Sequence, residues 1–384
     1  MRIALVGPAW PYRGGISHYN TCLAEELCGT HEVEVVNYSR LYPGFLFPGK
    51  TQYDESKDAH RVDSVRLIDS INPFTWVRAG FHLVRSRPDA VLVQWWHPYF
   101  APAIFKICSI VRMFTKARIV FICHNVVPHE KSLVDRLLAR IAFSTAHGFM
   151  VQSEEDRENL LAMKKNAVAG IHPHPIYDFF KKGDTGRDEA RKSIGEEPGN
   201  LILFFGYIRA YKGLEFLIRS MSEIISRIPA RLLVVGEFYE DREPYDRLVS
   251  ELGLEDSIRF VDRYVENEEV QQYFSACDLV VLPYISATQS GIAQIAVAFD
   301  RPMVVTRVGG LPEVVAEGRT GFVVDPGDPS ALADRIIGFF TEGLAEKMAP
   351  FFEEEKKRFS WESMVNALKA LIVRAGEGGR KIDG

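Results

Sequence analysis

The sequence predicts an α/β protein built from two successive doubly wound domains, each with a parallel sheet. Short apolar runs rich in β-branched residues alternate with amphipathic stretches of helical spacing along most of the 384 residues. This alternation breaks near Pro173 and starts again at Leu201, after a polar stretch. The two parts of the chain also differ in net charge, which is +3 for residues 1–180 and −8 for the remaining residues. We therefore place the first domain at 1–180 and the second at 181–360.

Strands and helices alternate in the first domain, which predicts βαβ units and a parallel sheet. The strands are expected at Ile3–Val6, Glu32–Asn37, Val65–Ile68, Ala90–Gln94, Arg118–Ile122, Gly148–Val151 and Ala167–Gly170. The helices are expected at Ile16–Cys28, Pro73–Arg85, Tyr99–Phe114, Leu133–Ser144 and Glu154–Met163. Residues 40–62 are rich in Pro, Gly and polar residues and predict a long loop, which in compact domains is often functional.

The same alternation predicts the second domain after the polar stretch Lys181–Asn200. The strands are expected at Leu201–Phe205, Arg231–Val235, Ile258–Val261, Leu279–Leu282, Met303–Thr306 and Phe322–Val324. The helices are expected at Gly213–Arg227, Pro244–Leu252, Asn267–Ala276, Gly291–Phe299 and Ser330–Phe340. Two such domains leave a cleft where the carboxyl ends of both sheets face each other, and ligands bind at such positions.

The C-terminal part predicts one or two helices between Ala345 and Ala375. Apolar residues at helical spacing mark the last of them, which we place at 361–375. Residues 376–384 are rich in Gly and charge and are expected to be disordered.

Composition excludes several classes of protein. A net charge of −5 argues against general affinity for nucleic acid. The five cysteines form no C-x-x-C pair and no zinc-like spacing, so we expect no metal and a reducing, cytoplasmic compartment. The apolar start of the chain is too short for a secretory signal. Charged residues interrupt the longest apolar region, Tyr99–Cys123, so it cannot be a spanning helix.

The stretch Leu203–Glu215 combines features that bind an anion. A buried strand ends at a turn, Gly206, and two cations, Arg209 and Lys212, precede the next helix. Helix N–H groups, the helix dipole and two positive side chains favour a phosphate or diphosphate. The alternative is an ordinary βα turn with two solvated cations.

A second glycine turn, Gly14-Gly15, follows the first strand. Glycine allows the backbone to approach a ligand closely, and the next helix offers N–H groups. The turn is not G-x-G-x-x-G, so the fingerprint of nicotinamide-binding folds is absent. Alone, the pair signals only a loop.

His124-Asn125 ends the apolar strand of residues 119–123, and the following loop adds His129 and Glu130. A histidine at the carboxyl end of a strand points into the expected cleft, where it could donate a hydrogen bond to a sugar hydroxyl or stabilise charge. The alternatives are a structural histidine bonded to local backbone and, with less support, a metal ligand.

A third turn, Ala287–Ile292, places polar side chains and a glycine, Ser290-Gly291, before a helix of small residues. This arrangement predicts a second anion- or hydroxyl-binding turn in the same domain. The alternative is an ordinary N-cap at Ser290 or Thr288.

The helix Tyr99–Phe114 carries a basic ridge. Lys106, Ser109, Arg112 and Lys116 fall on one side of it, and Trp95-Trp96 precedes it. A basic ridge with aromatic residues can seat a domain on an anionic bilayer. The alternative is the solvated face of a crossover helix.

Over about residues 1–375 and in the same order, these motifs resemble the retaining glycosyltransferases of family 4, the glycosyl transferases group 1. The segment Pro302–Val315 also resembles the Pro-Val-Val, Gly-Gly and Glu-Val-Val segment of that family. The resemblance implies the GT-B fold, with two facing Rossmann-like domains and a C-terminal helix that crosses back.

The resemblance also implies roles for individual residues. His124 would contact the transferred sugar, and Arg209 and Lys212 the donor diphosphate. The remaining donor-binding positions are implied to be Gly14, Gly15, Gly206, Gly236, Glu237, Tyr264, Val265, Ser290 and Gly291. Asn125, His129 and Glu130 are candidates for the acceptor side.

One feature departs from the family. Its members carry two glutamates before the position of Pro302, one for the transferred sugar and one for the ribose. Counting back without gaps places Ile295 and Ala287 there, and Gln289 is the nearest polar residue. We therefore take Gln289 as the candidate catalytic stand-in.

The sequence thus predicts a retaining hexosyltransferase (EC 2.4) that moves a sugar from a nucleotide-diphospho-sugar to a glycan or lipid-linked acceptor, in the synthesis of a surface glycoconjugate or polysaccharide. We expect no cofactor and no metal, a cytoplasmic location, and peripheral contact of the first domain with the inner membrane face. The alternatives are an epimerase or phosphorylase of the same fold, a non-catalytic nucleotide-sugar-binding protein and, with least support, a nicotinamide oxidoreductase.

Overall fold

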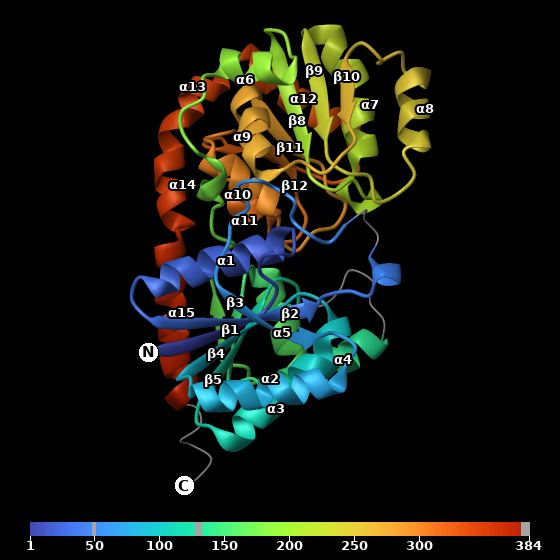
Figure 1. Cartoon of the computed structure of the whole chain (residues 1–384). Coiled ribbons are helices and arrows are strands. Elements are labelled where there is room, and N and C mark those ends of the chain that lie inside the picture. Colours follow the sequence, from blue (N-terminus) through green and yellow to red (C-terminus); the bar gives the residue numbers. More distant parts are fainter. Residues whose placement is uncertain (48–50, 127–132, 378–384) are drawn as a thin grey trace. The chain divides into compact units, whose positions relative to one another are not determined.

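The computed structural model describes residues 1–47, 51–126 and 133–377 and divides the chain into two units (Figure 1). The first unit comprises residues 1–55, 59–173 and the chain from Ser360 onward. The second comprises Ser56–Asp58 and His174–Phe359. The division between the units therefore lies between residues 173 and 174, shortly before the expected boundary, and three residues of the long loop belong to the second unit.

The first unit contains a seven-stranded parallel sheet of order β3-β2-β1-β4-β5-β6-β7. The strands are β1 (Arg2–Val6), β2 (Glu32–Arg40), β3 (Ser64–Asp69), β4 (Ala90–Trp95), β5 (Arg118–Cys123), β6 (Gly148–Val151) and β7 (Ala169–Ile171). The helices that alternate with them are α1 (Gly15–Cys28), α2 (Pro73–Ser86), α3 (Ala101–Phe114), α4 (Leu133–Phe143) and α5 (Glu154–Met163). The strand order reverses between β1 and β4, which is the topological switch point where ligands bind in such sheets.

The central strands of this sheet are buried on both faces. All six residues of β4 are buried, and β5 is buried from Ile119 to Cys123. Continuous apolar burial is typical of parallel strands covered by helices on both sides. Large aromatic residues fill the space between the sheet and α4, where the Phe143 ring lies 5.0 Å from Trp95 and 5.1 Å from Phe149.

The second unit repeats the architecture with six parallel strands of order β10-β9-β8-β11-β12-β13. The strands are β8 (Asn200–Phe205), β9 (Ala230–Val235), β10 (Ile258–Val261), β11 (Leu279–Leu282), β12 (Met303–Thr306) and β13 (Gly321–Val324). The main helices are α7 (Leu214–Arg227), α8 (Glu243–Glu251), α9 (Asn267–Ala276), α10 (Gly291–Ala298) and α12 (Pro329–Thr341). Its switch point lies between β8 and β11.

The last helix, α15 (Trp361–Glu377), belongs to the first unit. The Trp361 ring packs against Tyr19 of α1 at 5.0 Å, and Leu371 is fully buried. Gly376 and Glu377 are helical and not disordered as expected, because the apolar face of α15 continues to Ala375. Residues 378–384 of the expected disordered tail lie outside the described residues.

Several helices were not predicted. The first, α6 (Arg187–Ile194), lies in the polar stretch that we took as irregular. The second, α11 (Leu311–Val314), is one short turn. The C-terminal part forms α13 (Leu344–Met348) and α14 (Phe352–Arg358) before α15, where one or two helices were expected.

Candidate functional site

The carboxyl ends of β8 and β9 meet at two glycines. Gly206 follows β8 and Gly236 follows β9, both with positive φ. A Cβ added at Gly236 would lie 2.1 Å from the Gly206 carbonyl oxygen, so only glycine fits this crossing. The chain segments continue side by side, because Ile208 N–H donates to Glu237 O and Tyr239 N–H to Ile208 O. This crossing brings the turn after β8 next to the turn after β9.

Lys212 lies at the base of this turn. It is buried, with its ammonium group 5.5 Å from the centroid of the Tyr284 ring, and a Cβ added at Gly206 would lie 3.0 Å from its Nζ. Burial, and secondarily the neighbouring Arg209 cation, lower the pKa of Lys212 from 10.5 to about 7. The alternative of two solvated cations is thus wrong for Lys212, because Tyr284, which follows β11, lies over it and Ile292 of α10 lies next to it.

Arg209 is exposed, and its guanidinium lies 5.0 Å from the centroid of the Tyr239 ring. The ring of Tyr207 packs against Tyr239 at 4.5 Å and against Tyr264 at 6.3 Å. Tyrosine rings therefore follow three neighbouring strands at this edge. Aromatic surfaces of this kind can stack with a planar group. Neither Tyr207 nor Tyr239 was singled out in the sequence, although a tyrosine two to four residues after each of these three strands was visible.

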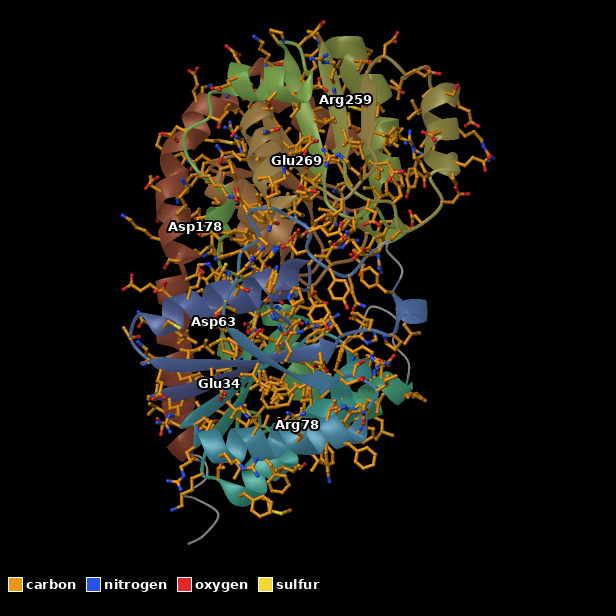
Figure 2. All side chains as sticks on the ribbon, in the orientation of Figure 1. Glu34, Asp63, Arg78, Asp178, Arg259 and Glu269 are labelled. Carbon is orange, nitrogen blue, oxygen red and sulfur yellow. The ribbon has the colours of Figure 1, made fainter. Side chains whose placement is uncertain are left out.

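Tyr264 and Val265, the candidate base-reading residues, follow β10 beside Arg263. That arginine is held by Glu269, which is labelled on α9 in Figure 2. Val265 is buried and Tyr264 half-buried, while Glu237 is buried after β9. All three follow strands whose carboxyl ends lie at the same edge as Gly206.

The turn Ser290-Gly291 lies beside Lys212. The side chain of Ile292, the next residue, would lie 3.2 Å from a Cβ added at Gly206, and the Tyr284 hydroxyl lies 3.4 Å from Ser290 Oγ. Ser290 is the N-cap residue of α10, whose first-turn N–H groups point toward this edge. Tyr284, which the sequence did not mark, contacts both Lys212 and Ser290.

Gln289 packs over a different glycine. A Cβ added at Gly310 would lie 1.9 Å from Gln289 Nε2, and Gly310 N–H donates to Thr288 O. The Gln289 amide therefore lies at the turn after β12, and Gly310 leaves the space that it occupies. The second unit thus brings Gly206, Arg209, Lys212, Gly236, Ser290 and Gly291 to one edge, with Gln289 on the neighbouring turn.

In the first unit, Gly14 is the N-cap residue of α1, with φ of 103°, and Gly15 is exposed. The first turns of α1 carry Tyr19 and Asn20, which are fully buried at the carboxyl edge of β1 and β4. The Tyr19 ring meets the His124 ring edge-on at 4.5 Å. The glycine turn and His124 therefore belong to one region of this unit.

His124 is buried and hydrogen-bonded at both ring nitrogens. Its Nε2 lies 2.7 Å from Gln94 Oε1, and Gln152 Nε2 lies 3.2 Å from its Nδ1. Asn125 is half-buried beside it. His129 and Glu130, the other acceptor-side candidates, lie outside the described residues. The sequence did not single out Gln94 or Gln152, although a glutamine inside the otherwise apolar β4 is an unusual residue.

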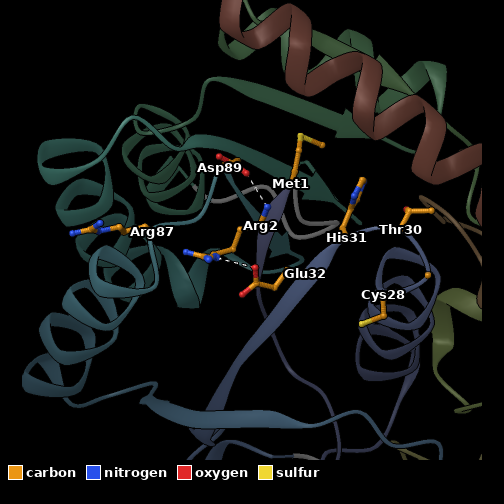
Figure 3. Close-up of a pocket in the computed structure, with 9 residues that line it drawn as sticks. Met1, Arg2, Cys28, Thr30, His31, Glu32, Arg87 and Asp89 are labelled. Atoms are coloured by element: carbon orange, nitrogen blue, oxygen red, sulfur yellow. Dashed lines mark hydrogen bonds and ion pairs between the residues drawn. The ribbon is translucent and has the colours of Figure 1, made fainter.

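The hollow in Figure 3 lies at the opposite, amino-terminal edge of the first sheet. Its charged residues bond to one another, since Arg2 N–H donates to Asp89 and the Arg2 guanidinium pairs with Glu32. It contains none of the predicted site residues.

Residues 1–47, 51–126 and 133–377 contain neither a cluster of metal ligands nor a helix that could span a membrane. No three or more His, Cys, Asp or Glu side chains come together there as a metal site would require. No helix in these ranges has both the length and the apolar character needed to cross a membrane.

The site-bearing segment is similar to known proteins. Residues 199–342 match the family model described as glycosyl transferases group 1. D-inositol 3-phosphate glycosyltransferase 2 of Catenulispora acidiphila is 30% identical over 239 residues, which are 59% of this chain and 55% of that protein. The chain spans about half the length of the curated relatives that it matches.

Solved structures confirm the fold class. Sucrose-phosphate synthase from Thermosynechococcus elongatus superposes with a TM-score of 0.73 at 20% identity, covering 99% of this chain and 98% of that one. HepE of Anabaena, solved with UDP and with UDP-glucose, superposes in the UDP complex with a TM-score of 0.73 at 16% identity, covering 96% and 100%. The fold is therefore GT-B, as the resemblance implied.

Proposed function

We propose that this chain, whose residues 199–342 match the glycosyl transferases group 1, is a retaining glycosyltransferase with a nucleotide-diphospho-sugar donor. The observation that carries the proposal is the pair Arg209 and Lys212 at the switch point of the second sheet, beside the N-terminus of α10. Parallel sheets bind ligands at this position. The UDP bound to HepE, a protein of the same fold, supports a nucleotide in this role.

These two cations assist the departure of the leaving group. As the bond between the anomeric carbon and the diphosphate oxygen breaks, its electron pair moves to the diphosphate. Arg209 and Lys212 stabilise that charge, together with N–H groups at the start of α10. Two fixed cations supply positive charge at this point, so the proposed step needs no metal or cofactor.

The acceptor hydroxyl attacks the anomeric carbon from the face that the diphosphate leaves, and its proton passes to a leaving phosphate oxygen. The products are a glycoside with retained configuration and a nucleoside diphosphate. We assign His124 and Gln289 to the sugar, and Gly14, Gly15, Tyr264 and Val265 to the donor. The acceptor is a glycan or lipid-linked sugar of surface glycoconjugate or polysaccharide synthesis, made on the cytoplasmic side.

The proposal is tested in two steps. A thermal-melting panel of nucleotide sugars first selects the donor, because a ligand of the folded state raises the melting temperature. Transfer is then followed as release of nucleoside diphosphate together with a labelled product, using the selected donor and a panel of glycan and lipid-linked acceptors. Donor binding without any transfer would favour the non-catalytic alternative, and net change of the donor sugar without an acceptor would favour an epimerase.

Arg209→Ala tests the leaving-group site. We expect turnover to fall about a hundred- to a thousand-fold, the usual loss when one charge-stabilising donor is removed. Stability should change by less than about 0.5 kcal/mol, because Arg209 is exposed. Arg219→Ala, on the exposed face of α7, is the matched control. Normal turnover of Arg209→Ala would disprove the assignment.

We also propose that the first unit contacts a membrane surface through the face formed by α2, α3 and α4. In the first unit, α3 packs against both other helices (Figure 1). Their sequences contain six Lys or Arg and a single acidic residue. Arg78, labelled on α2 in Figure 2, is one of the exposed cations. This excess of positive charge on the three helices complements the negative charge of an anionic bilayer.

The same face exposes large apolar side chains, which soluble surfaces rarely do in groups. Phe74 is 86% exposed and Leu133 83%. The other exposed apolar residues of the three helices are Phe81, Phe105, Met113, Phe114, Val134, Leu137 and Ile141. The predicted aromatic pair has no part in it, because Trp95 is buried against Phe143 and Trp96 donates to the Tyr42 hydroxyl.

Vesicle sedimentation tests this contact. We expect binding to vesicles that contain phosphatidylglycerol but not to pure phosphatidylcholine, and release in high salt. The double variant Phe74→Ser, Leu133→Ser should lose binding several-fold. Val373→Ser, which removes an exposed apolar side chain of α15, should not. Equal sedimentation of the double variant and the control would reject this face.

A further inference from the structure

A buried chain of hydrogen bonds lies behind His124. It joins Asn20 of α1, Gln94 of β4, His124 after β5 and Gln152 after β6. None of the four is more than 8% exposed. The links are Asn20 Nδ2 to Pro8 O at 3.1 Å, Gln94 Nε2 to Asn20 Oδ1 at 3.0 Å, and His124 Nε2 to Gln94 Oε1 at 2.7 Å. Four polar side chains from four elements thus form one connected network.

The directions of the hydrogen bonds between Pro8 and His124 follow from one end. The Pro8 carbonyl can only accept, so Asn20 must present its NH₂ group there and its oxygen to Gln94. Gln94 then donates from its NH₂ group, which turns its oxygen toward His124. An amide oxygen only accepts, so the proton lies on His124 Nε2. The NH₂ group of Gln152, which can only donate, faces Nδ1, so Nδ1 is the acceptor and the ring is neutral.

The surrounding packing keeps this arrangement in place. A Cβ added at Gly7 would lie 2.5 Å from Gln94 Cγ, so glycine after β1 leaves the space for the Gln94 side chain. The buried Tyr19 ring contacts the His124 ring edge-on. A reversal of one amide would leave buried donors and acceptors unsatisfied, which is costly in a site closed to water.

We propose that Asn20, Gln94 and Gln152 hold His124 as the neutral Nε2–H tautomer and are therefore positioning residues for it. The consequence for catalysis rests on the proposed function. A sugar whose anomeric carbon becomes cation-like would be repelled by an imidazolium but not by a neutral ring. The network thus orients the ring and opposes its protonation, because a second proton would have to be placed on Nδ1 against the NH₂ group of Gln152.

Histidine nitrogen chemical shifts test the tautomer directly in the whole wild-type chain, without substrate. His124→Gln identifies the resonances by their loss. We expect the Nε2–H pattern at pH about 7 and no protonation of this ring at pH about 6, where a free imidazole is largely protonated. An Nδ1–H pattern, or an imidazolium at pH about 7, would overturn the inference.

Gln152→Glu tests the network by replacing the donor to Nδ1 with an acceptor of nearly the same shape. We expect the His124 ring to become imidazolium near neutral pH. Turnover should fall about tenfold at pH about 6 relative to wild type, with the loss reduced at higher pH. Gln272→Glu, on α9 of the second unit, adds the same charge and should change neither the shifts nor the pH profile. An unchanged ring in a folded Gln152→Glu variant would also overturn the inference.

Failure of the tautomer assignment can be distinguished from failure of the proposed function. If the shifts behave as expected but no donor and acceptor pair gives transfer, the proposed function fails and the tautomer assignment stands. If transfer occurs but the shifts show another protonation state, the tautomer assignment fails and the proposed function stands.

Discussion

Lys212 is a buried cation whose charge state depends on what occupies the site. Within the described part of the chain, no carboxylate pairs with it, and the charge that acts on it is that of Arg209, another cation. Because burial lowers the pKa of Lys212 to about 7, its side chain changes charge near neutral pH. A bound diphosphate favours the charged form, so binding above pH about 7 must take up a proton.

We therefore predict that affinity for the nucleoside diphosphate weakens as pH rises above about 7, by at most tenfold per pH unit. Calorimetric titrations at pH about 6.5 and about 8.5, in two buffers of different ionisation enthalpy, measure both the affinity and the proton uptake. Lys212→Met should bind more weakly and lose this pH dependence. If the affinity of Lys212→Met falls with pH as steeply as that of the wild type, another group is responsible for the pH dependence.

A rise in pH has the opposite effect on the stability of the ligand-free protein, which increases. The pKa of Lys212 is lower in the folded state than its ordinary value of 10.5, so the unfolded chain binds more protons between pH about 7 and 10.5. The contribution of Lys212 to the free energy of unfolding therefore increases as pH rises through that window. Without ligand at pH about 7, Lys212→Met should melt at a higher temperature than wild type.

At the scale of elements, the meeting of β8 and β9 depends on glycine. Gly236→Ala would place a Cβ 2.1 Å from a backbone oxygen at φ of 146°, where no flexible side chain can move away. We predict a loss of about 3 kcal/mol in the second unit. Gly338→Ala, inside α12 with 3.8 Å to its nearest atom, should instead stabilise by about 0.5–1 kcal/mol. Thermal melting distinguishes the two, and equal shifts would contradict the argument.

Several elements were predictable from sequence to the residue, among them the polar helix α5, whereas α6 was not. The bounds of α5, α9, β6 and β10–β12 agree with the prediction. By contrast, α6 docks mainly through a charged side chain, because buried Arg191 pairs with Asp278 at 2.7 Å. An ion pair between residues far apart in the sequence gives no local period, so the stretch read as irregular.

The candidate site was also predictable only in part. Glycine turns and cations after strands follow from the alternation of strands and helices. The burial of Lys212 could not be predicted, because it depends on Tyr284 and on the start of α10. The glutamines around His124 were missed for the same reason. Gln94 lies in β4 and Gln152 just after β6, and only the strand order β4-β5-β6 makes them neighbours.

At the scale of the whole molecule, the chain completes its first unit with its last helix. Three buried residues of α15, Met364, Leu368 and Leu371, are at most 1% exposed. Polar contacts join the same helix to β7 and its surroundings, since Arg374 donates to Ala169 O and His172 Nε2 lies 3.0 Å from Ser363 Oγ. Trp361 also contacts Tyr19, which contacts His124. The far end of the chain therefore supports the candidate site of the first unit.

Two substitutions two residues apart on α15 test this support. Leu371 is fully buried and Val373 is 61% exposed. Leu371→Ser removes buried apolar contacts and places a hydroxyl among them, so we predict that the first unit loses about 3 kcal/mol. Val373→Ser should change stability by less than about 0.5 kcal/mol. Amide hydrogen exchange should quicken in β5, β6 and β7 of Leu371→Ser and stay unchanged in β8–β11, because α15 belongs to the first unit alone. Faster exchange spread equally over both sheets would mean that α15 stabilises the chain as a whole and not the first unit.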